Sequence, residues 1–167
     1  MRLKQAMLAV VAATLPLPAV AQTAAEAFEC KLPYRATMEN AAKLKVLREG
    51  KPMNMVISTM TIIELDPGAT RIYGLTPDRT SILMSEPSES SANKAVSMNF
   101  QSYFAHTPTM ESALLAAVKW KQPCRGVIGF CRRDGDAPGI GTLMVRFDSD
   151  KIMLECEFKV NDRDVQQ

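Results

Sequence analysis

The strongest constraint on the fold lies in the last quarter of the chain, where apolar and polar residues alternate strictly. One alternating run covers residues 142–147 and a second covers residues 152–160, with the short polar segment Asp148-Ser149-Asp150 between them. Successive side chains of a strand point to opposite sides of a sheet, so a period of two is typical of a strand with one buried face. Two such runs around a polar turn predict an antiparallel β-hairpin.

Apolar runs bounded by turn residues predict further strands earlier in the chain. We expect these at residues 28–32, 53–65, 70–74, 80–84 and 96–104. The clearest turn between them is Asp66-Pro67-Gly68, since proline presets φ and glycine supplies a positive φ. Residues 22–27 are expected to form a small polar tail, and the serine-rich residues 85–94 a loop.

One segment after the last of these strands has the signals of a helix. Thr107 suits the N-cap and Pro108 the first helical position, whereas Pro123 ends the segment. Met110, Leu114 and Val118 recur at every fourth position and therefore share one face. The expected fold class is α+β: an antiparallel β-sheet, made of a meander plus the C-terminal hairpin, with one principal α-helix packed on it.

The N-terminus has the pattern of a cleavable secretion signal. Arg2 and Lys4 precede an apolar run, and small residues at Ala19 and Ala21 occupy the two positions that signal peptidase recognises. The run is shorter than the roughly 20 residues that a membrane-spanning helix needs, which argues against a membrane anchor. We expect a signal peptide at residues 1–21 and a single disulfide-containing domain at residues 22–167.

The composition of the expected mature chain limits the compartments and the classes of partner that are compatible with it. No asparagine has Ser or Thr two residues on, so the chain lacks an N-glycosylation acceptor, which favours a bacterial periplasmic or secreted protein. The 20 Lys and Arg residues include Arg2 and Lys4, so the remainder equals the 18 Asp and Glu residues. A domain without net charge has no global attraction for polyanions, which argues against nucleic acid as a partner.

Four cysteines lie after the expected cleavage site. An even number in an oxidising compartment predicts two disulfides, and four cysteines allow three pairings. On the expected strands, Cys30 and Cys156 each share a face with apolar residues, so the two can meet on the buried side. Cys124 and Cys131 would then close a short loop between the helix and the final hairpin. Zinc is disfavoured, because Cys-x-x-Cys and neighbouring histidines are absent.

The search for catalytic motifs in the sequence is negative. His106 is the single histidine, so a Ser-His-Asp or Cys-His site would depend on it, and its place before the helix favours a structural role. Asp134-Gly135-Asp136 lacks the later ligands of a calcium loop and is interpreted as a turn. We therefore predict no catalytic residue, no cofactor and no metal ligand.

Methionine keeps a copper-handling role open as an alternative. Thioethers bind Cu(I), and Met53, Met55 and Met60 lie close together in the sequence. Alternation along a strand would place Met53 and Met55 on one face, where packing in the core explains them equally well.

One local excess of positive charge stands out in the otherwise neutral chain. The basic residues surround the single tryptophan and the expected short disulfide loop. The set is Lys119, Trp120, Lys121, Arg125, Arg132 and Arg133. A tryptophan surrounded by cations is a frequent anchor of protein interfaces. The simpler explanation is that these basic residues are exposed to solvent and have no partner. The hypothesis is a contact surface for an acidic protein or an anionic envelope polymer.

The function that these observations favour is a non-catalytic one. We expect a small exported envelope protein that acts as a binding, inhibitor or accessory module. The alternatives are an envelope hydrolase that uses carboxylate acid/base chemistry and, less favoured, a periplasmic copper-handling protein. The sequence is silent on the oligomeric state.

Overall fold

The computed structural model describes residues 19–56, 58–68, 70–88, 96–120, 130–136 and 139–160, without the side chains of residues 19–23 and 160. Within these residues all strands join one antiparallel sheet in the order β1-β3-β4-β5-β8-β7-β6, and β2 also pairs with β3. The strands are β1 (Val46–Glu49), β2 (Met53–Asn54), β3 (Ser58–Leu65), β4 (Arg79–Pro87), β5 (Val96–Ala105), β6 (Phe130–Arg133), β7 (Thr142–Phe147) and β8 (Lys151–Val160). The helices are α1 (Ala19–Phe28), α2 (Tyr34–Ala41) and α3 (Pro108–Ala117).

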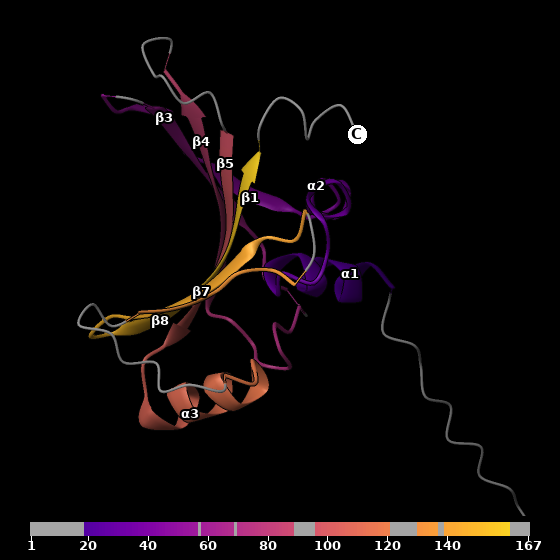
Figure 1. The fold of residues 1–167 in the computed structure, drawn as a ribbon, viewed down its shortest axis with the longest axis vertical. Coiled ribbons are helices and arrows are strands. Elements are labelled where there is room, and N and C mark those ends of the chain that lie inside the picture. The colour runs from indigo at the N-terminus through magenta and orange to yellow at the C-terminus, as the bar shows by residue number, and fades with distance from the viewer. Residues whose placement is uncertain are drawn as a thin grey trace, which may run out of the picture.

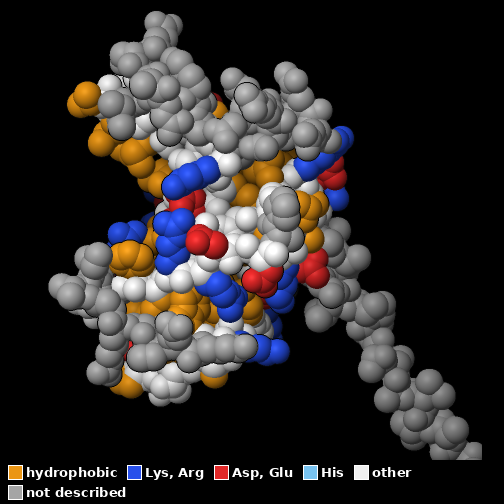
Figure 2. All heavy atoms as spheres, in the orientation of Figure 1, with side chains coloured by type: hydrophobic (Ala, Val, Ile, Leu, Met, Phe, Trp, Pro, Cys, Tyr) orange, Lys and Arg blue, Asp and Glu red, His pale blue; other side chains and the backbone are white. Residues whose placement is uncertain are grey.

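The sheet is bent, and the helices leave one of its faces uncovered (Figure 1). Helices α1 and α2 lie against the middle of the sheet, and α3 lies near the ends of β7 and β8. Side chains from α1 and α3 belong to the same apolar cluster as those of β5 and β8, so these helices cover the same face. We call it the helical face, and the opposite one the open face. In the same view, acidic and basic side chains gather across the middle of the molecule (Figure 2).

The core forms where α1 packs on the central strands β5 and β8. Phe28 of α1 meets Phe100 of β5 edge to face, with ring centroids 5.5 Å apart, and Phe158 of β8 meets the same Phe100 at 6.0 Å. Ala24 and Ala27 of α1 are also buried, and their small side chains let the helix approach the sheet closely. The centre of the molecule is therefore aromatic and tightly packed.

The expected fold class and its main elements are confirmed. The C-terminal alternation forms the hairpin β7–β8, and β3, β4 and β5 form the meander. The N-cap assignment is also correct, because the Thr107 hydroxyl accepts a hydrogen bond from the Met110 amide at 3.1 Å. The turn at residues 66–68 is present, with Gly68 at a φ of 46° and its amide bonded to the Asp66 carboxylate.

The N-terminal part of the expected domain differs from the prediction. Residues 24–28 form the last half of α1 instead of a polar tail, and residues 28–32 form the end of that helix and a turn instead of a strand. Alanine has the highest helix propensity, and the apolar surface buried against the sheet favours the helix further. Residues 28–32 are too short a run for periodicity to distinguish the two structures.

Two other expected segments also differ. Residues 70–74 form a turn in which Ile72 and Leu75 make an isolated bridge, because Gly74 at a φ of 80° reverses the chain. Strand β4 continues to Pro87, so the first part of the expected loop at 85–94 is a strand, and residues 89–95 lie outside the described part. None of the described helices is long and apolar enough to cross a membrane.

The expected cleavage position falls inside α1. The helix begins at Ala19, and the buried side chains described in it begin at Ala24. Cleavage after Ala21 stays a prediction, and it would leave these buried alanines and Phe28 in the mature chain.

Candidate functional site

A cavity of about 500 Å³ lies on the helical face, between the ends of two helices and the edge of the sheet. Its walls come from the segment after α1, from the turn at Tyr73, from the end of α3, from β6 and the residues after it, and from the start of β7. Small-molecule and peptide side-chain pockets commonly have volumes of about 300–1,000 Å³, so this cavity can admit a ligand group.

Three residues that line this cavity have left-handed backbone conformations. They are Cys30, Tyr73 and Lys119, with φ values of 54°, 51° and 55°, and they are the complete set of non-glycine residues with positive φ in the described part of the chain. Such conformations are uncommon outside glycine and gather at functional sites. Their gathering here marks the cavity as the candidate site.

Two of the three conformations arise from the way the helices end. At the end of α1 the Lys31 amide bonds to the Glu26 carbonyl, and at the end of α3 the Trp120 amide bonds to the Leu115 carbonyl, both at 3.1 Å. These bonds define Schellman motifs, in which the residue before the donor is left-handed and is usually glycine. The negative ends of two helix dipoles therefore reach the cavity, where basic side chains are favourable neighbours.

The disulfide Cys30–Cys156 fixes the segment after α1 to the central strand β8. The two Cα atoms are 5.4 Å apart, and the cysteines are separated by 126 residues in sequence. The pairing is as predicted, although Cys30 follows a helix and does not lie on a strand. A bridge that closes so long a loop contributes about 5 kcal/mol to stability in the chain-entropy treatment.

The second expected bridge is only partly visible. Cys131 is buried in β6 and is disulfide-bonded. Cys124 lies outside the described residues, so the pairing of Cys124 with Cys131 stays a prediction.

A buried carboxylate anchors one wall of the cavity. The Glu29 side chain is 6% exposed, forms an ion pair with Lys31 at 2.5 Å, and accepts a short hydrogen bond from the Tyr73 amide. The Tyr73 hydroxyl donates to the Glu29 carbonyl at 2.8 Å. Burial, together with the Glu29 charge, raises the pKa of Tyr73 to about 12 although Arg133 acts in the opposite direction. Tyr73 therefore keeps its proton and acts as a hydrogen-bond donor.

Arg133 forms the basic side of the cavity. Its guanidinium donates to the Val118 carbonyl at 3.2 Å, at the end of α3, and lies over the Trp120 ring at 5.4 Å from the centroid. Trp120 is half-buried and packs against the core, so its ring lies between the core and the Arg133 guanidinium. Lys119, next to Trp120, is exposed and makes no ion pair within the described residues.

The structure divides the basic cluster that the sequence suggested. Lys119 and Arg133 line the cavity, and the Trp120 ring packs against Arg133. Arg132 precedes Arg133 in β6, so its side chain points to the opposite side of the strand, where it bonds to Asp134 at 3.1 Å. Hydrogen bonds from Thr142 and from Arg132 lower the pKa of Asp134. The remaining two residues, Lys121 and Arg125, lie outside the described part of the chain.

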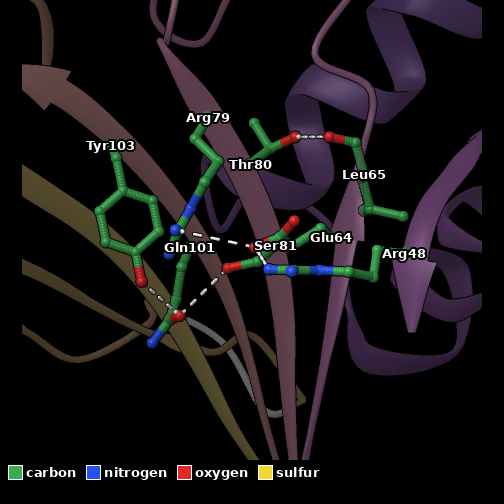
Figure 3. A network of polar contacts seen from close by, with 8 residues as sticks. All are labelled: Arg48, Glu64, Leu65, Arg79, Thr80, Ser81, Gln101 and Tyr103. Atoms are coloured by element: carbon green, nitrogen blue, oxygen red, sulfur yellow. Dashed lines mark hydrogen bonds and ion pairs between the residues drawn. The ribbon is translucent and has the colours of Figure 1, made fainter. Parts of the chain in front are cut away.

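A second polar arrangement crosses the open face. Residues aligned in register on adjacent strands form a row of polar side chains, which we call the polar row. Its members are Arg48, Glu64, Ser81, Gln101 and Glu155. Figure 3 shows Glu64 bonded to Arg48 at 2.8 Å and paired with Arg79, and Gln101 accepting from Ser81 and Tyr103.

Glu155 ends this row as a buried carboxyl group. It is 5% exposed and accepts a hydrogen bond from Gln101 at 2.6 Å and another from Asn99 at 3.1 Å. Burial raises the pKa of Glu155 against the opposing effect of the amide donor of Gln101. The side-chain oxygen Oδ1 of Asn99 is buried and has no hydrogen-bond partner among the described residues. Sequence reasoning missed this group, because alternation assigns Glu155 to a solvent face and only the strand register reveals its neighbours.

His106 joins the start of α3 to the turn of the C-terminal hairpin. One ring nitrogen lies 2.5 Å from the Asp148 carbonyl oxygen, and the other lies 3.0 Å from the Glu111 carboxylate. The hydrogen bond with Glu111 is the main reason why the pKa of His106 is raised. Both nitrogens are engaged in contacts that connect elements, as expected of a structural histidine.

The fold and the site define an α+β domain with one antiparallel sheet and a cavity between its β6 edge and the disulfide-linked segment after α1. Comparison of the chain with protein-family models, with curated proteins and with solved structures found no match. The site geometry is therefore the basis for the proposals that follow.

Proposed function

We propose that the protein is a non-catalytic binding module of the cell envelope that receives an acidic segment of a partner protein in the cavity. The observation that carries this proposal is that Lys119 and Arg133 line a cavity of suitable size, with the half-buried Trp120 ring packed against the Arg133 guanidinium. Arginine and tryptophan are the residue types most enriched among interface anchors.

The pairing of charges around the cavity supports an acidic occupant. Glu29 and Asp134 are already paired with Lys31 and Arg132. Arg133 uses one of its five donor groups on the Val118 carbonyl, which also neutralises the end of α3, and Lys119 has no carboxylate partner in the described part. Among the lining carboxylates only Asp136 is without a described ion pair, so two cations face one carboxylate.

The rigidity of the walls favours binding further. The disulfide, the two helix ends and the contacts of Tyr73 with Glu29 hold the lining residues in place before a partner arrives. A pre-organised surface loses less conformational entropy on binding, so more of the interaction free energy is retained.

Titration of the mature protein with a short glutamate-rich peptide, followed by NMR, tests this proposal. We expect shifts concentrated at the amides of Tyr73, Lys119 and Arg133, with affinity that falls as salt is added. An anionic polysaccharide of the same charge serves as the comparison. Shifts spread over the surface, or stronger binding of the polysaccharide, would contradict the protein-binding proposal.

A hydrolase that uses carboxylate chemistry is the second candidate, and Glu155 favours it. A carboxyl group with a raised pKa suits general acid catalysis, and Glu157 follows on the same side of β8. However, amide donors occupy Glu155, so proton transfer to a substrate would require these bonds to break. Turnover of a glycan substrate that is lost in Glu155→Gln with the fold intact would favour this function over the binding module.

A further inference from the structure

The hairpin formed by β2 and β3 brings three methionines together in register. Met53 and Met60 are direct partners across the two strands. Met55 lies two residues after Met53, and its amide donates to the Ser58 carbonyl at 2.7 Å, which closes the hairpin. Directly opposed residues share a face of the sheet. Met55 follows the last residue of β2, and its hydrogen bond to Ser58 continues the register of β2 and β3 by one more pair, which places it on the same side as Met53. The three thioether side chains are therefore at neighbouring positions of one face.

Two of these side chains are exposed, which the core packing suggested by the sequence does not explain. Met53 is 47% exposed and Met55 is 56% exposed, whereas Met60 is half-buried. Exposed strand positions favour threonine and β-branched residues over methionine. Two exposed thioethers beside a half-buried third therefore call for a reason other than packing or strand propensity.

The spacing suits a ligand that is held by thioether sulfur. Directly opposed Cα atoms in an antiparallel pair lie about 4.5–5.5 Å apart, and diagonal neighbours about 7–8 Å apart, within reach of long side chains. Methionine has three rotatable bonds, so its sulfur can adjust to a shared ligand. Among the common metal ions, Cu(I) is the one that thioethers select.

We propose that Met53, Met55 and Met60 bind one Cu(I) ion at the free end of the β2–β3 hairpin. The site is separate from the cavity, which lies at the other side of the sheet order beside β6 and β7. It does not depend on the proposed binding function. It needs no cysteine, which is consistent with the oxidised state of Cys30, Cys131 and Cys156.

Competition with a coloured Cu(I) chelator tests the site on the full mature protein. Ascorbate keeps copper reduced and leaves disulfides intact, and mass spectrometry verifies the Cys30–Cys156 disulfide before and after. We expect one Cu(I) per chain and an X-ray absorption spectrum with sulfur as the only ligand type. The Met53→Leu/Met60→Leu double variant should bind at least tenfold more weakly, with an unchanged thermal unfolding midpoint.

Met144→Leu is the matched control. Met144 lies on the open face in β7, and the residues directly opposite it are Arg132 and Glu155. Its diagonal neighbour Met153 has its sulfur in contact with Arg146, so Met144 lacks the directly opposed methionine that the hairpin provides. Its replacement should leave Cu(I) affinity unchanged. Failure of the wild-type protein to compete with the chelator, or equal binding by the double variant, would overturn the proposal. Concentration-dependent self-association that is the same in the double variant would instead identify the exposed hairpin as an apolar contact surface.

Discussion

Lys119 shows how a single residue can report on a site. Its left-handed conformation completes the Schellman motif of α3, a position at which glycine is usual, and it places a cation at the rim of the cavity. Cys30 has the same role at the end of α1, and there the side chain forms the disulfide. Both residues therefore have an unfavourable backbone conformation, and each has a side chain that glycine could not replace: a disulfide-forming thiol in one case and a cation in the other.

Replacement of Lys119 by glycine should raise stability. The glycine removes the strain of a left-handed non-glycine residue, a gain of roughly 0.5–1 kcal/mol in the free energy of unfolding. Denaturant unfolding measures the change. Ser112→Gly, at an exposed position inside α3, should have the opposite sign, because glycine is unfavourable in a helix interior. A destabilised Lys119→Gly variant would show that the lysine side chain contributes more than its conformation costs.

At the scale of elements, the sequence predicted the strands and the helix that a local residue pattern determines. The hairpin β7–β8 and helix α3 follow from strict alternation and from capping residues, and both are present. Helix α1 was missed, because its alanines give no periodic contrast and only packing on β5 and β8 reveals their buried side. The cavity was missed for a related reason: Tyr73, Lys119 and Arg133 come together through long-range contacts that no local pattern contains.

The N-cap of α3 offers a test at this scale. Thr107→Ala removes the hydroxyl that accepts the Met110 amide and should lower the free energy of unfolding by about 1 kcal/mol. Thr107→Ser keeps the hydroxyl and should stay within a few tenths of the wild-type value. Thermal and denaturant unfolding of the two variants compare them directly. Equal loss in both variants would mean that the threonine methyl group, and not the cap, stabilises the helix.

The whole molecule combines a rigid helical face with titratable groups that make its stability depend on pH. The raised pKa of Glu155 means that the folded state holds this proton more tightly than the unfolded state, so ionisation destabilises the fold as pH rises above the ordinary value of 4.5. The raised pKa of His106 stabilises the fold fully below 6.5, and this contribution is lost as pH rises through the folded-state pKa. Both groups therefore stabilise the folded state more at low pH than at high pH.

We therefore expect the thermal unfolding midpoint to rise as pH falls from mildly alkaline values to about 5. Glu155→Gln removes the ionisation and should flatten the lower part of this profile. His106→Gln should flatten the upper part. Below pH 3.8, protonation of Asp134 lowers the unfolding midpoint again, because the pKa of Asp134 is lowered in the folded state. A profile that rises steadily with pH in both variants and in the wild type would contradict these assignments.

The central claim is that the cavity beside the disulfide, and not a general basic surface, receives an acidic partner. Arg132 and Arg133 are adjacent and are the same residue type, but only Arg133 lines the cavity. Calorimetric titration of Arg133→Gln and Arg132→Gln with the glutamate-rich peptide therefore isolates the site. We predict at least a tenfold loss of affinity in Arg133→Gln and a far smaller loss in Arg132→Gln, which only leaves the lining carboxylate Asp134 without its ion pair. Equal losses in both variants, or none in either, would contradict the claim.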